Sequence, residues 1–287
     1  MSERLRVVVD GLAFPEGPRW HDGWLWFSDM HTGRVMRLDP DTGSVETVVE
    51  VPGRPSGLGW DREGRLLVVS MRDRRLLRRG PGGVDLEEVA DLSDLATWYC
   101  NDMVVDTSGR AYVGNFGFDI EVPAEEMRPV PAVLARVDPD GTVSVAADDL
   151  MFPNGTVITP DGRTMIVAES FAGVLTAFDV DPDGSLSGRR VWAPLDGVAP
   201  DGICLDAQGA VWVADAFGAR VLRVAEGGEI LDSVGAAQNT YACMLGGPRG
   251  TTLFVCTAPG SDPGECEARM GGRIEAAEVE VPRAGLP

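Results

Sequence analysis

One short frame recurs along this chain: an aromatic residue or alanine, then proline, a polar residue and glycine. It is clearest at 14–17 (FPEG), 152–155 (FPNG) and 199–202 (APDG). Alignment on its third position gives six segments spaced 40, 45, 53, 47 and 41 residues apart. A period of about 40 to 50 residues is typical of β-propeller blades. The residues at the third position, called slot residues below, are Glu16, Ser56, Asn101, Asn154, Asp201 and Ala242.

Each segment predicts two short apolar strands joined by a turn of the D-x-x-G or P-D-G type. In the first segment the second strand is WLWFSD at 24–29, and an alternating third strand follows at 33–40. One small sheet cannot bury its faces alone, so we expect residues 1–287 to form a single all-β domain, a six-bladed β-propeller. Strand-like segments at 5–11 and 273–281 are expected to pair in the last blade, which would remove an exposed edge.

The slot residues are predicted to meet at one end of the central channel, because the first strand of each propeller blade lines that channel. Two of them are carboxylates and two are amides. Such oxygen ligands suit hard cations such as Ca²⁺ or Mg²⁺, whereas zinc usually recruits Cys or His. We therefore predict one metal site in the channel, formed by Glu16, Asn101, Asn154 and Asp201. Stabilisation of β-turns is the alternative role of each slot residue.

The turns between second and third strands return to the same end of the channel as the slot residues. They carry four phenylalanines that we expect to line a substrate pocket, with packing between blades as the alternative role: Phe116, Phe118, Phe171 and Phe217. His31 lies in another of these turns and is a candidate substrate contact. A serine nucleophile is not expected, because the chain has no G-x-S-x-G elbow.

Charge and cysteine content limit the partners and the compartment. A net charge of −20 disfavours nucleic acid and anionic membranes as partners and is compatible with attracting a cation. Five cysteines without a CxxC pair predict neither a zinc site nor a disulfide framework. With no apolar signal region and no run long enough to cross a bilayer, we expect a cytoplasmic protein. A closed ring has no edge to cover, so we expect a monomer or a weak homo-oligomer.

At these residues the chain resembles a known family, the regucalcin (senescence marker protein), gluconolactonase and luciferin-regenerating-enzyme-like propellers. The matching segments are EGPRW at 16–20, NDMVVDTSGRAYVGNFGFD at 101–119, FPNGTVITPDGRTMIVAES at 152–170 and DGICLDAQGAVWVAD at 201–215. The resemblance implies a divalent-metal hydrolase that opens lactones, or that acts on organophosphate esters in some members. It also implies Glu16, Asn154 and Asp201 as metal ligands, with Asn101 as a fourth ligand or a substrate contact.

The resemblance also draws attention to Tyr99. Members that act on sugar lactones often carry an arginine there that binds substrate hydroxyls, so Tyr99, next to Trp98, predicts a less polar pocket. We expect the cation to polarise the carbonyl of a small lactone or ester substrate, with Asp201 as general base and Glu16 as second candidate. Attack by a water on the cation is the alternative. Ca²⁺ is the favoured cation, and Mn²⁺, Mg²⁺ and Zn²⁺ stay open.

Two other functions are compatible with these residues. One is hydrolysis of an organophosphate or another ester at the same site. The other is a non-catalytic propeller that binds a metal, because a fold and a metal site do not by themselves establish chemistry.

Overall fold

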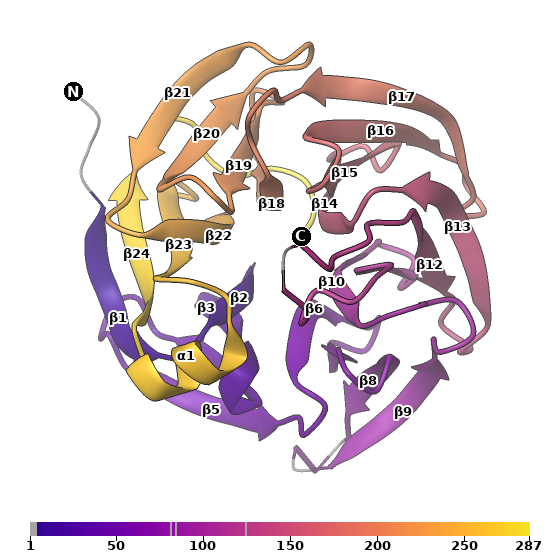
Figure 1. Ribbon diagram of the computed structural model, residues 1–287, viewed down its shortest axis with the longest axis horizontal. Coiled ribbons are helices and arrows are strands. Elements are labelled where there is room, and N and C mark those ends of the chain that lie inside the picture. Colours follow the sequence, from indigo (N-terminus) through magenta and orange to yellow (C-terminus); the bar gives the residue numbers. More distant parts are fainter. Residues whose placement is uncertain (1–4, 81, 84, 124) are drawn as a thin grey trace.

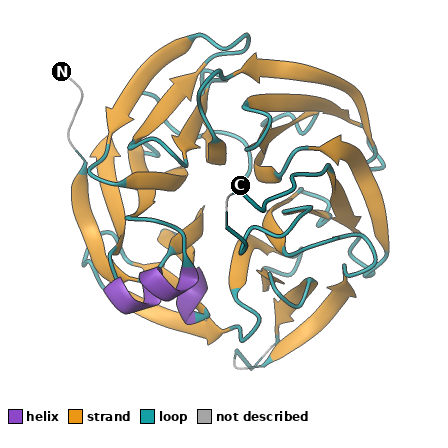
Figure 2. Cartoon of the chain, in the orientation of Figure 1, coloured by secondary structure: helices purple, strands orange, loops and turns teal. Residues whose placement is uncertain are grey.

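The computed structural model is a ring of six four-stranded antiparallel sheets around a central axis (Figure 1). It describes residues 5–80, 82–83, 85–123 and 125–287. Strands dominate, and the helical elements of the described residues are α1 (Pro263–Arg269) and the 3-10 turn η1 (Met30–Thr32) (Figure 2). No helix in this part of the chain has the length and apolar content of a membrane span. The predicted all-β six-bladed propeller is confirmed.

Five blades follow the chain from the innermost strand to the outermost. Blade one is β2 (Pro15–His21), β3 (Trp24–Asp29), β4 (Arg34–Leu38) and β5 (Val45–Glu50). Blade two is β6 (Pro55–Trp60), β7 (Leu66–Ser70), β8 (Arg75–Arg79) and β9 (Leu86–Asp91). Blade three is β10 (Cys100–Val105), β11 (Ala111–Asn115), β12 (Ala132–Val137) and β13 (Val143–Leu150). Blade four is β14 (Pro153–Ile158), β15 (Thr164–Glu169), β16 (Val174–Val180) and β17 (Leu186–Pro194). Blade five is β18 (Pro200–Leu205), β19 (Val211–Asp215), β20 (Arg220–Val224) and β21 (Ile230–Gly235).

The sixth blade joins the two ends of the chain. Its strands are β22 (Asn239–Gly246), β23 (Thr252–Ala258), β24 (Gly272–Glu278) and, outermost, β1 (Arg6–Leu12). β1 pairs antiparallel with β24, so that Arg6 lies opposite Ala276 and Leu12 opposite Gly272. The predicted pairing of the end segments is therefore confirmed, and it closes the ring without leaving β24 as an open edge.

Each innermost strand has a register shift at its slot residue, where it pairs with the second strand of its blade. The glycine of the frame follows the slot because neighbouring innermost strands approach closely there. A Cβ atom on Gly155 would lie 2.6 Å from the backbone oxygen of Asp201, and one on Gly202 would lie 2.4 Å from the Cβ of Ala242. Blade contact thus explains why glycine recurs after the slot.

Residues 282–287 cover one end of the channel, and Figure 1 places the C-terminus near the centre of the ring. Leu286 exchanges two backbone hydrogen bonds with Ile158, of 2.8 and 2.9 Å, and the Ala284 N–H donates to the Leu205 carbonyl at 2.9 Å. Ile158 and Leu205 end β14 and β18, whereas the slot residues lie at the beginnings of these strands. The segment therefore covers the end opposite the slot residues, and the slot end is called the mouth below.

Removing residues 282–287 is expected to lower the free energy of unfolding by about 2 to 5 kcal/mol, because several backbone hydrogen bonds worth about 0.5–1.5 kcal/mol each are lost. Denaturation in guanidinium chloride measures this. Gly285→Val is the matched variant of full length: at φ +68° a side chain is strained, and its Cβ would lie 2.3 Å from the Ile158 oxygen. Unchanged stability in both variants would contradict a stabilising role for the segment.

Candidate active site

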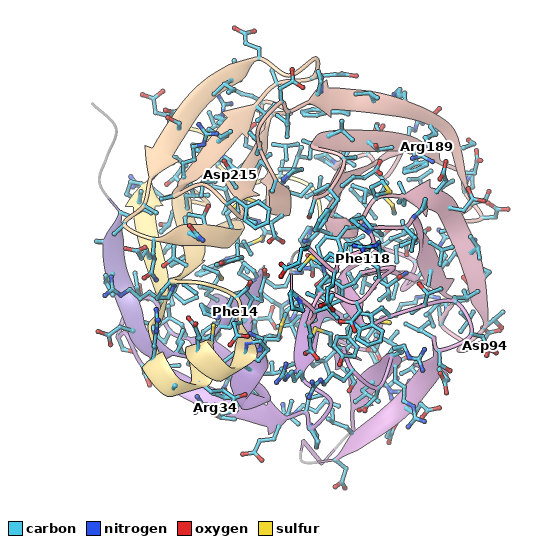
Figure 3. All side chains as sticks on the ribbon, in the orientation of Figure 1. Phe14, Arg34, Asp94, Phe118, Arg189 and Asp215 are labelled. Carbon is cyan, nitrogen blue, oxygen red and sulfur yellow. The ribbon has the colours of Figure 1, made fainter. Side chains whose placement is uncertain are left out.

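One hydrophobic cluster encircles the mouth. Its buried members come from all six blades, including in blade order Phe14, Met71, Phe116, Phe152, Ala199 and Tyr241. Side chains from six blades can form one contact cluster only around the axis. Figure 3 accordingly shows Phe14 and Phe118 nearer the centre of the ring than Arg34, Asp94 and Arg189. The mouth is therefore a mainly apolar environment around the slot residues.

Two carboxylates from different blades interact within this environment. Glu16 lies near the start of β2 and Asp201 near the start of β18, where Asp201 is 8% exposed. Burial raises the pKa of Glu16 well above its usual value, and the charge of Asp201 raises it further. Burial also raises the pKa of Asp201, followed by the charge of Asp102. The Asp201 Oδ1 atom is buried and has no hydrogen-bond partner.

The slot amides Asn101 and Asn154 are also buried, 6% and 4% exposed. Asn154 interacts with the Asp201 carboxylate and lowers its pKa, opposing the effect of burial. Its Nδ2 donates to Ser170 Oγ at 3.1 Å. The Asn101 Oδ1 accepts a hydrogen bond of 3.3 Å from Ser56 Oγ. These interactions connect slots of neighbouring blades, so the structure brings the slot residues together at the mouth.

These residues fit a hard cation, although a metal site is not itself visible. No group of three or more His, Cys, Asp or Glu side chains within the described residues is arranged to hold a metal ion. The slot set instead combines two carboxylates with two amides, and all four supply the oxygen atoms that Ca²⁺ prefers. A cation would give the Oδ1 of Asp201 the partner that it lacks. It would also offset the negative charges of Asp201 and Glu16.

A buried ion pair next to the slots was not predicted from the sequence. Arg19 Nη2 donates to Asp102 Oδ1 at 2.5 Å and to the Met103 carbonyl at 2.6 Å, while Nε donates to the Leu58 carbonyl at 3.1 Å. Arg19 is 3% exposed and Asp102 7%. The available signal was that Asp102 follows its slot residue, whereas glycine follows the slot residue in four of the other five segments.

The predicted phenylalanines divide into two groups. Phe116 and Phe118 are both 6% exposed in the mouth cluster, and Phe171, 41% exposed, packs edge-on against Phe118 with 5.1 Å between ring centroids. Phe217 is 79% exposed and is not packed into the buried cluster, so its assignment to the pocket wall stays a prediction. A hydrogen bond from the Gly218 N–H to the Asp215 carbonyl closes its turn and leaves the ring on the surface.

Phe152 was not predicted from the sequence, although it holds the same place in the repeat as Tyr99, which was. Phe152 and Tyr99 each precede a slot residue by two positions, and both contact the mouth cluster. The Tyr99 ring meets Phe116 edge-on at 6.3 Å, and its hydroxyl donates to Glu121 at 3.2 Å. The phenol therefore directs its one polar group to a side chain of the protein.

His31 stacks on Phe14 at the mouth, with 4.9 Å between ring centroids. Its Nε2 lies 3.2 Å from the Ser261 carbonyl, and its Nδ1 is buried without a partner. Burial, followed by the charge of Arg54, lowers the pKa of His31 to about 4. The imidazole is therefore neutral at pH 7 and offers one unused nitrogen at the mouth.

Replacement of Arg54 by glutamine is expected to raise the pKa of His31 from about 4 toward the usual 6.5, because one nearby positive charge is removed. NMR titration of the two histidines, with His21→Gln for assignment, measures it. In the wild type the folded pKa of His31 lies below its ordinary value of 6.5, so folding favours the neutral ring. The contribution of His31 to stability is therefore complete above pH 6.5 and is lost as the pH falls toward 4. An unperturbed His31 in the wild type would contradict the described burial.

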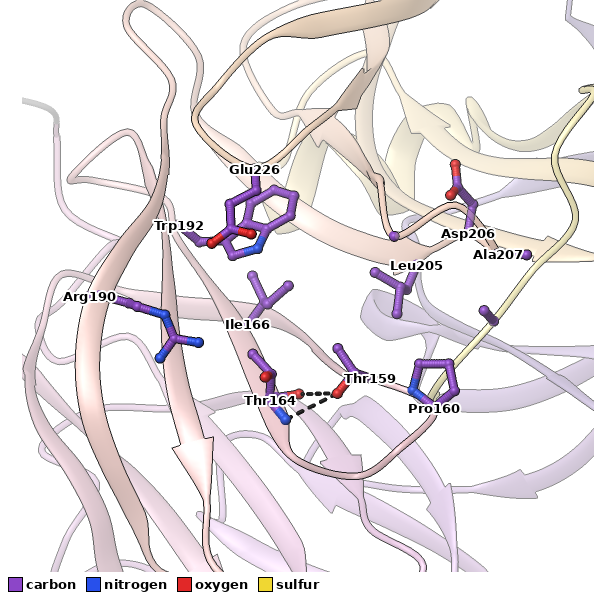
Figure 4. Close-up of a pocket in the computed structure, with 12 residues that line it drawn as sticks. Thr159, Pro160, Thr164, Ile166, Arg190, Trp192, Leu205, Asp206, Ala207 and Glu226 are labelled. Carbon is purple, nitrogen blue, oxygen red and sulfur yellow. Dashed lines mark hydrogen bonds between the residues drawn. The ribbon is translucent and has the colours of Figure 1, made fainter.

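A separate cleft of about 350 Å³ lies between blades four and five (Figure 4). It is lined by the turns that follow β14 and β18, at the covered end of the channel, and by Trp192 and Arg190 of β17. No slot residue lines it, and its polar groups include Thr159, bonded to Thr164, and Asp206, paired with Arg223. The mouth, where unpartnered groups converge, is therefore the candidate site.

Comparison with known proteins identifies the family of this chain. Residues 14–259 match the SMP-30/Gluconolactonase/LRE-like region. The chain belongs to this family. Within the family, it is 31% identical to pentonolactonase XacC of Haloferax volcanii, over 90% of this chain and 86% of that protein. It is 28% identical to 6-deoxy-6-sulfogluconolactonase of Pseudomonas putida, over 100% and 99% of the two chains. The structure of the calcium-binding protein regucalcin from Agrobacterium tumefaciens superposes with a TM-score of 0.81 at 21% identity, covering 100% of this chain and 97% of that one.

Proposed function

We propose that this chain is a divalent-cation-dependent lactonase, with Ca²⁺ as the favoured ion. The pentonolactonase and the sulfogluconolactonase among its relatives support a lactone substrate. The cation requirement rests on the buried pair Glu16 and Asp201, and in particular on the Asp201 oxygen that has no protein partner. Glu16, Asn154 and Asp201 would hold the ion, with Asn101 as a fourth ligand or a contact to substrate.

The bound cation would supply electrophilic polarisation of the lactone carbonyl and stabilise the developing oxyanion. The chain's own residues provide the remaining steps. Asp201 has two carboxylate oxygens, so it can serve as a ligand and still accept the proton of the attacking water. The oxygen of that water bonds to the carbonyl carbon, the ring C–O bond breaks, and the proton passes to the alkoxide leaving group. The product is an open hydroxy acid.

The test is hydrolysis of γ- and δ-lactones by metal-stripped protein to which Ca²⁺, Mn²⁺, Mg²⁺ or Zn²⁺ is added back. The rate of acid release is measured by pH-stat. We expect turnover only with an added cation, and its loss in Glu16→Ala. Turnover that persists after chelation, or in Glu16→Ala, would contradict the proposed role of the slot residues. A thermal shift with Ca²⁺ but no turnover of any lactone would favour the binding function.

A further inference from the structure

A second set of equivalent positions in the repeat lies two residues before the slots. Phe14, Arg54, Tyr99, Phe152 and Ala199 each precede a slot residue by two positions. Phe152 adopts φ +63° and Arg54, at the equivalent position of another blade, φ +69°. Bulky residues rarely occupy this left-handed region, and such conformations persist where the surrounding structure holds a side chain in a required direction.

Phe152 is directed into a group of rings from blades three and four. Its centroid lies 4.6 Å from that of Phe116 and 6.3 Å from that of Phe118, and Tyr99 lies 6.3 Å from Phe116. We name these four residues, Tyr99, Phe116, Phe118 and Phe152, the aromatic wall. The three phenylalanines are at most 8% exposed and belong to the same cluster as Phe14 and Tyr241 across the mouth. Tyr99 and Phe152 stand two positions before Asn101 and Asn154, so the wall lies at the slot end of blades three and four.

Two polar side chains beside the wall are already paired with the protein, and the Nε1 of Trp98, which stacks on Tyr99, is a buried donor without a partner. Asn115 donates from Nδ2 to the Val133 carbonyl at 2.7 Å and accepts from the Gly117 N–H at 3.0 Å. Glu169 accepts from the Met151 N–H at 2.7 Å. A polyhydroxylated ring placed against the wall would lose several hydrogen bonds to water, and one donor cannot replace them all, which is costly. An alkyl or aryl group would gain from burial there.

We propose that the substrates are lactones with an alkyl or aryl substituent, which packs on the aromatic wall while the lactone carbonyl faces Glu16 and Asp201. This inference rests on the proposed lactonase function and adds the substrate class. It predicts selectivity for apolar substituents over the hydroxyl groups of sugar lactones.

The experiment compares kcat/KM for γ-valerolactone, γ-nonalactone and D-glucono-δ-lactone. The first two differ only in the length of the alkyl chain, and each buried methylene is worth about fourfold. We expect wild-type protein to prefer γ-nonalactone to γ-valerolactone by at least about tenfold, and to disfavour the sugar lactone. Preference for the sugar lactone, or no dependence on chain length, would overturn the proposal.

Phe152→Asn tests the wall directly, since asparagine accepts a left-handed backbone and removes the ring. We expect it to reduce the preference for γ-nonalactone over γ-valerolactone at least about fivefold, because only the longer chain reaches the wall. Ile230→Asn, an apolar-to-polar change at a 53% exposed position on β21, is the control and should leave the preference intact. Equal losses with both lactones in Phe152→Asn would contradict the proposal.

Calorimetry with the lactam analogues of the two alkyl lactones, which resist hydrolysis, separates this inference from the lactonase proposal. If no lactone is hydrolysed but the pentyl lactam binds at least about tenfold more tightly than the methyl lactam, the aromatic wall recognises apolar groups and only the catalytic proposal fails. Equal or absent binding of both lactams would overturn the substrate class.

Discussion

Asp201→Asn is expected to lower kcat/KM for lactone hydrolysis by about 10²–10³-fold or more, the loss typical of removing one electrostatic contact to the transition state. The amide has nearly the same shape as the carboxylate and can remain beside Asn154. It lacks the charge that attracts a cation and the basic oxygen that accepts a proton. Initial rates at saturating Ca²⁺ measure the effect, and activity equal to the wild type would exclude Asp201 from both roles.

Asp201→Asn, although it lowers activity, should stabilise the protein in the absence of a cation. Burial raises the pKa of Asp201, so its ionised form opposes folding at neutral pH. Asp201→Asn is therefore expected to raise the Tm of metal-free protein and to remove the increase that Ca²⁺ produces in the wild type. Calorimetric scans with Ca²⁺ and with chelator measure both changes. A lower Tm in the metal-free variant would show that the carboxylate has a structural partner.

Asp215→Asn is a matched control in the same blade. Asp215 is 2% exposed, accepts the Ala199 N–H at 3.2 Å and pairs with Arg220 at 3.0 Å. This carboxylate holds the segment before β18 and is satisfied by the protein. The control is expected to lose stability but to keep the shift in Tm with Ca²⁺, so the two variants separate a structural carboxylate from a ligand.

The contrast between Asp201 and Asp215 also shows how far sequence reasoning reached. The repeat spacing predicted six blades, their closure and the slot residues, because propeller geometry places equivalent residues of each blade at equivalent positions. It could not separate acids that bind a ligand from acids that bind backbone. Asp29, at the end of β3, accepts the N–H groups of Ala13 and Phe14 at 3.0 and 2.9 Å, and the sequence alone does not reveal these bonds.

The direction of the side chains at the mouth was the second feature that the sequence could not predict. Phe217 and Phe152 both lie at mouth-end segments, yet Phe217 is exposed and Phe152 is buried in the cluster. The difference depends on local backbone angles, such as the φ of +63° at Phe152, which break the simple alternation of a strand. Pairs such as Arg19 and Asp102, 83 residues apart, depend in addition on the register shift at the slot.

The Arg19–Asp102 pair is expected to have the largest effect on stability. Arg19→Leu should lower the free energy of unfolding by about 3–5 kcal/mol, because it leaves a buried carboxylate without its partner. The charge of Asp102 also raises the pKa of Glu16 and Asp201, so the unpaired group would add to an acidic site. Chemical denaturation of metal-free protein at neutral pH measures the loss.

Asp102→Gly offers the complementary change, because glycine follows the slot in the neighbouring blades at Gly57 and Gly155. Alone it should also destabilise, since Arg19 would keep a buried charge without a carboxylate. The double variant, with Arg19→Leu and Asp102→Gly together, is expected to recover part of the lost free energy of unfolding. The coupling energy between the two positions should be about 1–3 kcal/mol. A double variant no more stable than Arg19→Leu would assign the role of Arg19 to its bonds with the Leu58 and Met103 carbonyls instead.

The double variant also separates the fold from the site. Asp102 lies close enough to Glu16 and Asp201 to influence both, so its removal should weaken Ca²⁺ binding even where stability recovers. Calorimetric titration with Ca²⁺ tests this, since loss of a neighbouring negative charge lowers the attraction for a dication. Unchanged affinity would mean that the Arg19 charge cancels that of Asp102 at the slots. In that case the role of Asp102, at the position where neighbouring blades have glycine, is to pair with Arg19 and so connect blade three to blade one.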